Sequence, residues 1–475
     1  MQFYNTLSRH KEVFTPISDK EVKIYSCGPT VYSSPHIGNL RAYIFTDLLR
    51  RTLEFLGFTV IHVVNITDVG HLTSDASDGE DKLEAGARRE NSTPLEIARK
   101  YEIEFREDLK KLNILTPSKL PRASEHISEQ IELIKKLSAK EFTYITSDGI
   151  YFDTGKFQNY GKLSGQCLEE KEAGARVNVR SEKRNPADFA LWKFCVGENE
   201  NHILRWDFDG QPVKQNQDFD ESEVRAQKIG FPGWHIECSA MSMKYLGEIF
   251  DIHTGGVDHI PVHHENEIAQ SEAATGKKFV NFWLHNEFLT VDGGKMSKSL
   301  GNLFTITDLD ERGFDPITFR YFCLGTHYRT KLNFTWDALH GAAHSLNNLR
   351  KIFQSLPAAE DPFDANISEF TNALADDLNS PQALAVVWKT AKSEVLSPAV
   401  KRATIAKFDE VLGLDLGRQE TEIKLSEGQK RLLDEREEAR VQKNWKRADE
   451  IRAEFAQQNI EVEDTVNGQI VKRKL

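Results

Sequence analysis

The stretch from residue 22 to residue 66 constrains the fold of this 475-residue chain most strongly. The run Val22–Cys27 is short, apolar and partly alternating, and it ends at Gly28-Pro29, which predicts a strand followed by a turn. Apolar residues keep helical spacing from Leu40 to Gly57, and the β-branched run 58–66 predicts a buried strand. This order predicts a parallel βαβ unit, the opening of a doubly wound nucleotide-binding sheet.

A second α/β segment follows far along the chain. Its pattern predicts a strand over 248–254, a helix over about 263–275 and another strand near 278–284. We therefore expect the sheet to be split by an insertion from about residue 110 to residue 225. A helix is predicted within it over 125–137.

The insertion is also expected to contain a hairpin over 144–152 that turns at Asp148-Gly149. The polar stretch 198–227 predicts an exposed, mobile loop or β excursion. Helices with apolar residues at helical spacing are predicted over 337–356, 367–378, 381–395 and 400–412. A further helix pair over 425–457 and a short β element over 460–471 complete the expected elements.

Composition places the chain among ordinary globular proteins, with 39% hydrophobic and 28% charged residues. The net charge of -12 argues against a protein coated with basic surface, although a local Lys/Arg stripe suffices for a nucleic-acid partner. Five widely spaced cysteines predict no disulfide framework and a reducing compartment. Residues 1–14 lack the apolar core of a signal peptide, and no stretch approaches a membrane span. We expect a cytoplasmic protein without a membrane partner.

Two short strings far apart predict one nucleotide site. The first, His36-Ile37-Gly38, lies where the first strand gives way to the first helix, and a helix N-terminus suits phosphate oxygens. Gly38 allows a nucleotide to approach the backbone closely, and His36 can donate a hydrogen bond to phosphate. The second string, 292–299, places Lys295 and Lys298 near a leaving pyrophosphate. Either string alone is often only a solvated turn, but the pair in this order rarely arises by chance.

A possible metal site combines residues from three places. His263 and Glu267 are four residues apart and share one helix face, while Cys27 and Cys238 supply two thiols. These are reasonable zinc ligands, although their spacing is not that of a zinc finger. On spacing alone, two buried cysteines and a polar helix face remain the simpler interpretation.

Over nearly its whole length the chain resembles the cysteinyl-tRNA synthetases, which are class I aminoacyl-tRNA synthetases. Residues 34–41 resemble the HIGH signature of that class, with Asn39 at its second histidine, and 293–299 match its KMSKS loop. The other matching segments are 27–32, 65–69, 121–127, 160–166, 188–193, 232–241, 263–270, 448–452 and 463–465.

The resemblance implies one active-site zinc ion per chain, held by Cys27, Cys238, His263 and Glu267. A zinc ion separates cysteine from serine because it favours thiolate and deprotonates it, which packing alone cannot achieve. The resemblance also implies that Trp234 closes over the amino acid, that Thr67 lies near it, and that Asp258 contacts the ribose of ATP.

The implied reaction is that of a cysteine–tRNA ligase. ATP, with Mg²⁺, and L-cysteine give cysteinyl-adenylate, and the cysteine then passes to the 3′ end of tRNA(Cys). The implied roles are catalysis for His36, Asn39, Lys295 and Lys298, and ATP binding for His36, Gly38, Asp258 and Lys298. We expect a monomer. Two alternatives stay open: a cysteine ligase that acts on a small amine, and a non-catalytic tRNA-binding paralogue.

The resemblance also implies a domain order. A Rossmann-like catalytic domain is expected in two halves, 1–110 and 226–310, around a connective insertion at 111–225. A stem-contact region at 311–340, an all-α helix bundle at 341–418 and a small anticodon-binding domain at 419–475 are expected to follow.

Basic residues near the C-terminus are candidates for contact with tRNA phosphates and unpaired bases. The basic candidates are Arg431, Arg436, Arg440, Lys443, Lys446, Arg447 and Arg452. The aromatic residue Trp445 lies among them and is also a candidate. Acidic residues are interspersed, so a plain solvated helix face is the alternative.

Overall fold

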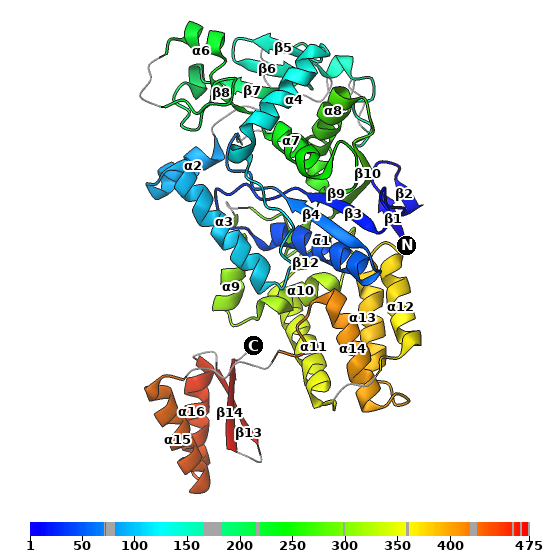
Figure 1. Cartoon of the computed structure of the whole chain (residues 1–475). Coiled ribbons are helices and arrows are strands. Elements are labelled where there is room, and N and C mark those ends of the chain that lie inside the picture. The colour runs from blue at the N-terminus through cyan, green and yellow to red at the C-terminus, as the bar shows by residue number, and fades with distance from the viewer. Residues whose placement is uncertain are drawn as a thin grey trace.

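The computed structural model describes residues 1–70, 72, 81–165, 182–214, 219–297, 300–357, 361–418, 425–457, 460–465 and 468–473. A four-stranded parallel sheet lies in the middle of the molecule (Figure 1). Its strands are, in spatial order, β10 (Val280–Asn286), β9 (Phe250–Gly256), β3 (Glu21–Ser26) and β4 (Thr59–Val64). Because β3 pairs with both β4 and β9, the sheet joins segments more than two hundred residues apart.

Helices cover both faces of this sheet, as a parallel sheet requires. Neighbouring residues of a strand point to opposite faces, so Ile24 and Tyr25 enter two different hydrophobic cores. The Ile24 core contains the apolar face of α1 (Ile37–Phe55), and the Tyr25 core contains residues of α7 (Trp234–Leu246) and α8 (His263–Thr275). The predicted doubly wound α/β arrangement is confirmed.

Between β4 and β9 the chain builds a second, antiparallel sheet. Its strand order is β5 (Thr143–Thr146), β6 (Gly149–Phe152), β7 (Phe189–Phe194) and β8 (Gly230–Pro232). Besides α7, the described helices of this part are α2 (Lys82–Glu90), α3 (Pro94–Lys111), α4 (Ile127–Ala139) and α6 (Glu221–Gln227). The predicted hairpin at Asp148-Gly149 is confirmed as β5–β6, and the helix predicted over 125–137 is confirmed as α4.

For 198–227 the sequence predicted an exposed, mobile loop or β excursion. The β alternative is confirmed at Trp206, which forms antiparallel bridges with Pro212 and Gly230, while the expected exposure is wrong for buried residues such as His202 and Trp206. Trp206 is only 8% exposed, and its backbone exchanges two 2.8 Å hydrogen bonds with Gly230 of β8. His202 is buried and stacks on Phe231 of the same strand, with ring centroids 3.8 Å apart. Since β8 is an edge strand of its sheet, this segment covers a strand edge that would otherwise be open to solvent.

Beyond β10, two short strands, β11 (Leu289–Val291) and β12 (Leu332–Phe334), form a parallel pair. Two helices, α9 (Ile306–Glu311) and α10 (Pro316–Leu324), lie between them in sequence. The four helices predicted after residue 337 are confirmed as α11 (Trp336–Ser355), α12 (Asp364–Ala375), α13 (Ser380–Ala391) and α14 (Pro398–Leu412).

The C-terminal part has a small core of its own. It consists of α15 (Glu427–Val441), α16 (Trp445–Gln457) and the antiparallel strands β13 (Ile460–Thr465) and β14 (Gly468–Arg473), as predicted. The buried residues of this core are Ile451, Phe455, Ile460 and Val462. At the other end of the chain, β1 (Gln2–Asn5) and β2 (His10–Val13) form a hairpin beside β10. No described helix has the length and apolarity that a membrane crossing needs.

Candidate active site

The carboxyl ends of β3 and β9 place the first group of site residues. Ligands of open parallel sheets bind at this edge, where the direction of the chain connections reverses. Cys27 follows β3 directly, and its backbone N–H donates to Thr254 of β9 at 3.3 Å. The short turn that follows β9 carries Asp258 and leads into α8, whose first residue is His263.

Four side chains converge there into what we call the Cys–His–Glu cluster, defined as Cys27, Cys238, His263 and Glu267. One ligand atom from each lies within 4.8 Å of all the others. The Nε2 atom of His263 is 3.1 Å from Oε1 of Glu267, and Sγ of Cys27 is 3.8 Å from the same oxygen. A tetrahedral zinc ion with ordinary bond lengths separates such atoms by about 3.3–3.8 Å, which is close to these two distances and smaller than the 4.8 Å that encloses all four atoms.

The charges of the cluster also suit a cation. Burial raises the pKa of Cys27 well above its usual value. Burial would do the same to Cys238, but a hydrogen bond from Cys27 and the charge of His263 bring its pKa down to about 6. Burial opposes a proton on His263, yet Glu267 and Cys238 raise its pKa to about 10. A divalent cation would take the place of the protons that now hold these groups together.

Further histidines, which the sequence analysis did not assign, surround the cluster. His253 of β9 contacts Oε2 of Glu267 at 3.0 Å, so the two oxygens of this carboxylate have different partners. His264 contacts Sγ of Cys27 at 3.2 Å through Nε2, and its Nδ1 lies 2.7 Å from Nε2 of His285. A second possible ligand group therefore exists, in which His253 and His264 replace Cys238 and His263.

The first ligand group is the better metal site, for a chemical reason. It offers two thiols, of which Cys238 has a depressed pKa, whereas the second group offers one thiol with a raised pKa. His253 and His264 are instead placed to orient Glu267 and Cys27, as partners behind metal ligands commonly do.

The two residues that were predicted to contact the substrate amino acid, Trp234 and Thr67, lie beside this cluster. The indole ring of Trp234, the first residue of α7, is 4.3 Å from the ring of His263. Thr67 is buried, accepts a hydrogen bond from Asn65 and donates one to Glu237 at 2.9 Å. The hydroxyl of Thr67 therefore already has partners, and its contact is with the residue next to Cys238.

The predicted phosphate end lies at the start of α1. His36 is the N-cap, and it forms a capping box with Asn39: each side chain accepts a hydrogen bond from the backbone N–H of the other. The N–H of Ile37 donates to Phe304 at 2.8 Å. Among these first described N–H groups, only that of Gly38 has no hydrogen-bond acceptor within the described residues. The start of α1 therefore offers fewer free N–H groups to a phosphate than the sequence predicted.

The second string of the nucleotide site begins with a tight turn after β11. Asp292 and Gly293 both have positive φ angles, 49° and 76°, and Val291 and Gly294 exchange hydrogen bonds across them. The Asn302 side chain then bridges the loop by accepting from Ser297 N and donating to Lys295 O. Lys295 is exposed, and Lys298 lies outside the described residues. Asp258 is also exposed, on the turn after β9.

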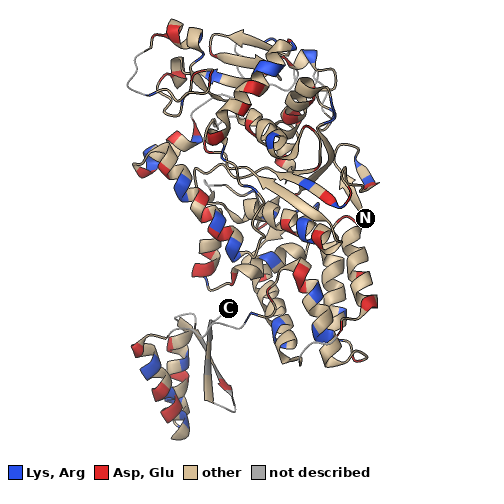
Figure 2. Ribbon diagram, in the orientation of Figure 1, with Lys and Arg blue, Asp and Glu red and all other residues tan. Residues whose placement is uncertain are grey.

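The candidate tRNA-contact residues near the C-terminus differ in how they are bound, and of them Arg431 and Arg452 are exposed. Arg436 and Arg440 form ion pairs with Asp464, and Arg447 forms ion pairs with three carboxylates of α15 and α16. The mixed charges along both helices (Figure 2) favour the solvated-helix interpretation for Arg440 and Arg447, whereas Arg436 is buried and joins α15 to β13. Trp445, in contrast, is 58% exposed at the start of α16, next to the exposed residues Lys443 and Lys446.

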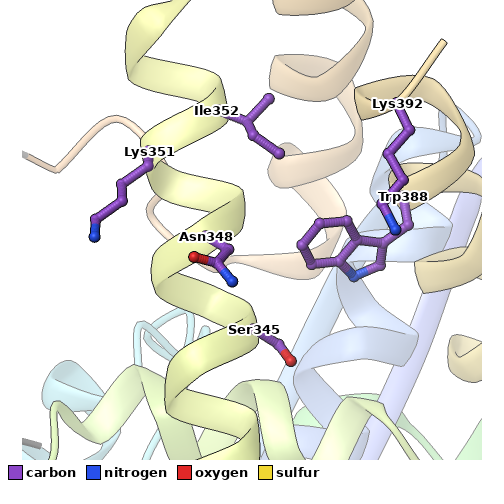
Figure 3. Close-up of a pocket in the computed structure, with 6 residues that line it drawn as sticks. All are labelled: Ser345, Asn348, Lys351, Ile352, Trp388 and Lys392. Carbon is purple, nitrogen blue, oxygen red and sulfur yellow. The ribbon is translucent and has the colours of Figure 1, made fainter.

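A separate groove of about 540 Å³ lies in the helix bundle, between α11 and α13 (Figure 3). It is lined by Ser345, Asn348, Lys351, Ile352, Trp388 and Lys392. None of these residues belongs to the sites described above.

The chain matches two family models. The model described as "tRNA synthetases class I (C) catalytic domain" matches residues 13–344. The model described as "Cysteinyl-tRNA ligase anticodon binding domain" matches residues 423–471.

Curated relatives match along almost the whole chain. A protein of Burkholderia lata named "Cysteine--tRNA ligase 1" is 47% identical over 472 residues, which cover 99% of this chain and 96% of the relative. A "Cysteine--tRNA ligase" of Treponema denticola is 42% identical and covers 98% of both chains.

Solved structures share the fold at low identity. The methionyl-tRNA synthetase of Mycobacterium tuberculosis in complex with methionyl-adenylate aligns with a TM-score of 0.54 at 16% identity, over 83% of this chain and 90% of that one. A LeuRS of Agrobacterium radiobacter in a ternary complex with tRNA and LeuAMS gives a TM-score of 0.57 at 12% identity, over 85% of both chains.

Proposed function

Because this chain belongs to the cysteine–tRNA ligase family, we propose that its Cys–His–Glu cluster holds one zinc ion that recognises the substrate cysteine. The enzyme joins cysteine to tRNA, as its relatives' name states, and it uses ATP to activate the amino acid, as the class I catalytic domain implies. The observation that supports the proposed metal site is the convergence of two thiols, one imidazole and one carboxylate within 4.8 Å.

A zinc ion bound there would supply a soft, positively charged centre that prefers a thiolate to a hydroxyl group. The protein's own residues do the rest of the recognition. Trp234 lies against His263 and forms a wall of the amino-acid site. Thr67 holds Glu237, which precedes Cys238 on α7, and so helps to fix that thiol.

ATP is proposed to bind between the start of α1 and the turn after β9, with Mg²⁺ on its phosphates. His36 is the half-buried N-cap of α1 and the N–H of Gly38 has no acceptor within the described residues, while the Asp258 carboxylate is exposed for the ribose hydroxyls. Asn39 uses its side-chain oxygen to accept from His36, which leaves its amide hydrogens to donate to a phosphate. Lys295 and Lys298 are proposed to stabilise charge on the departing pyrophosphate.

The C-terminal part is proposed to read the tRNA anticodon. Exposed Trp445 offers a face on which an unpaired base can stack, and the neighbouring lysines Lys443 and Lys446 offer contacts for phosphate. The match of this part to an anticodon-binding model disfavours a ligase that acts on a small amine, because such a ligase does not bind a tRNA anticodon.

The test is aminoacylation of total tRNA in the presence of zinc, with labelled cysteine and with labelled serine as the control. We expect charging with cysteine only. The variant Cys238→Ser should lose bound zinc and cysteine-dependent pyrophosphate exchange together, whereas Cys195→Ser, a buried thiol elsewhere, should keep both. Retention of one zinc ion per chain by Cys238→Ser would contradict the ligand assignment.

A further inference from the structure

Arg41, five residues after His36 on α1, binds an unusual set of acceptors. The side chain is 3% exposed. Its Nη1 atom donates to the carbonyl oxygens of Glu287 and Phe288, each at 2.7 Å, and its Nη2 atom donates to that of Thr330 at 2.6 Å. Two longer contacts of 3.4 Å reach the carbonyls of His327 and Tyr328.

These acceptors come from two separate segments of the chain. Residues 287 and 288 form the link between β10 and β11, and residues 327–330 form the link that leads into β12. Because β11 and β12 pair with each other, one guanidinium group holds together the entrances of both strands. All five acceptors are backbone oxygens, so the contact fixes the path of the chain itself.

The burial of this charge is costly, because the five acceptors described above are neutral carbonyl oxygens and not carboxylates. Burial lowers the pKa of Arg41 below its usual value, which reflects the same cost. A neutral apolar side chain would fill the same space with a smaller desolvation cost, but it could not donate hydrogen bonds to five carbonyl oxygens. The hydrogen bonds of Arg41 therefore fix residues 287–288 and residues 327–330 in one position relative to each other.

The strand β11 leads directly into the turn at 292–293 and the loop with Lys295. The return path of that loop is also fixed on α1, because the N–H of Ile37 donates to Phe304 at 2.8 Å. Between these two anchors, Met296 lies so close to Gly38 that a methyl group on Gly38 would be 3.2 Å from its sulfur atom. The first two turns of α1 thus hold the base of the loop on both sides.

We propose that Arg41 is a positioning residue for adenylate formation, which sets the place of the Lys295 loop relative to His36 and Gly38. The inference rests on the proposed ATP site. Arg41 itself touches no substrate; it acts through β11 and the turn that follows. A displacement of reacting groups by about 1 Å can cost a hundredfold in rate, so the anchor matters for kcat.

The chain offers a matched control on the same helix. Arg51 also donates to two backbone carbonyls, those of Asn113 and Glu410, and it pairs with Asp47. It contacts neither link that Arg41 binds. Arg51→Lys therefore removes comparable hydrogen bonds from α1 without releasing the loop.

The experiment compares Arg41→Lys and Arg51→Lys in the full-length, zinc-loaded enzyme, by cysteine-dependent ATP–pyrophosphate exchange. We expect Arg41→Lys to lower kcat by about 10- to 100-fold. Its KM for cysteine and its zinc content should stay within about twofold of the wild type, as should the kcat of Arg51→Lys. Equal losses of kcat in the two variants would overturn the proposal, since they would indicate a general effect on stability.

A second variant decides the question if Arg41→Lys does not fold. Asn333, exposed on β12, accepts hydrogen bonds from Gly293 N and from the Thr290 hydroxyl, and so holds the same turn from the solvent side. Asn333→Ala should lower kcat in the same assay by several-fold, with the KM for cysteine unchanged. An unchanged kcat would overturn the proposal. Absence of exchange in the wild-type enzyme would instead contradict the proposed function, and so separates the two failures.

Discussion

At the scale of single residues, Glu267 shows how the cluster is kept in order. Its Oε1 atom faces Cys27 and His263, while its Oε2 atom is held by His253, whose ring stacks on Trp283. A carboxylate fixed on one oxygen presents the other in a single direction. Such partners behind metal ligands typically contribute 10- to 100-fold to metal affinity.

We therefore expect His253→Phe, which keeps a flat ring but removes the hydrogen bond, to weaken zinc affinity by about 10- to 100-fold. Competition with a chelator measures this affinity. His126→Phe is the control, because His126 is also buried beside an aromatic ring but its hydrogen bonds within the described residues go to Arg122 O and the Tyr245 hydroxyl, and to no member of the cluster. Equal zinc affinity in the two variants would contradict the role given to His253.

A second prediction at this scale concerns pH. Burial and the nearby charge of Glu104 raise the pKa of Asp108, on α3, to about 7. Between pH 4 and pH 7 the folded state then binds more protons than the unfolded state, so this group lowers stability as the pH rises through that window. Asp108→Asn should stabilise the protein at pH 8 by about 1–3 kcal/mol and much less at pH 4.5.

Thermal unfolding at the two pH values measures the effect of Asp108→Asn. Arg99→Gln, at an exposed position of the same helix and not among the charges that shift the pKa of Asp108, should leave the unfolding temperature nearly unchanged at both. A gain for Asp108→Asn that is equal at pH 4.5 and pH 8 would rule out the titration of Asp108 as its cause.

At the scale of elements, the sequence predicted most helices and strands. It did not predict those segments whose structure depends on contacts with other parts of the chain. The long helices α11 to α14 follow from the spacing of their apolar residues, because each buries one face. The segment around Trp206 was predicted to be exposed because its polar composition does not reveal that β8 has an open edge. The three-residue strands β11 and β12 carry no pattern of their own.

The candidate site shows the same division. Cys27, Cys238, His263 and Glu267 were identified through resemblance, and the structure brings their ligand atoms together. The roles of His253 and His285 were not predicted, because a single histidine inside β9 or β10 has no pattern that distinguishes it from an ordinary strand residue before α8 packs on it.

The capping box of α1 yields a prediction for Asn39. Asn39→Ala removes the acceptor for the His36 N–H and should cost about 0.5–1 kcal/mol of stability. Asn39→Asp keeps the acceptor and should keep stability, but its negative charge near the ATP phosphates should slow adenylate formation at least tenfold. Thermal unfolding and pyrophosphate exchange measure the two effects. Equal exchange rates for the wild type and Asn39→Asp would place this side chain away from the phosphates.

At the scale of the whole molecule, the C-terminal core shares no residue with the cores around the central sheet. Removal of residues 419–475 should therefore leave cysteine-dependent pyrophosphate exchange within about twofold of the full chain. Aminoacylation should fall by at least tenfold in kcat/KM for tRNA, because a base-stacking surface is lost. Both assays use the same protein preparation. A parallel loss of exchange would show that the C-terminal part supports the catalytic domain instead.

The hairpin β1–β2 has a consequence for how the protein is made. Its strand β1 is fastened to a place far along the chain: the Gln2 side chain donates to Asp376 at 2.7 Å, 374 residues away, and Tyr4 N donates to Asp377 at 2.8 Å. At a synthesis rate of about 5–20 residues per second, the ribosome delivers that partner roughly 20–75 s after the hairpin emerges. The hydrogen bonds of Gln2 and Tyr4 to this partner can therefore form only after residue 377 has been translated, although β1 itself has been available since much earlier.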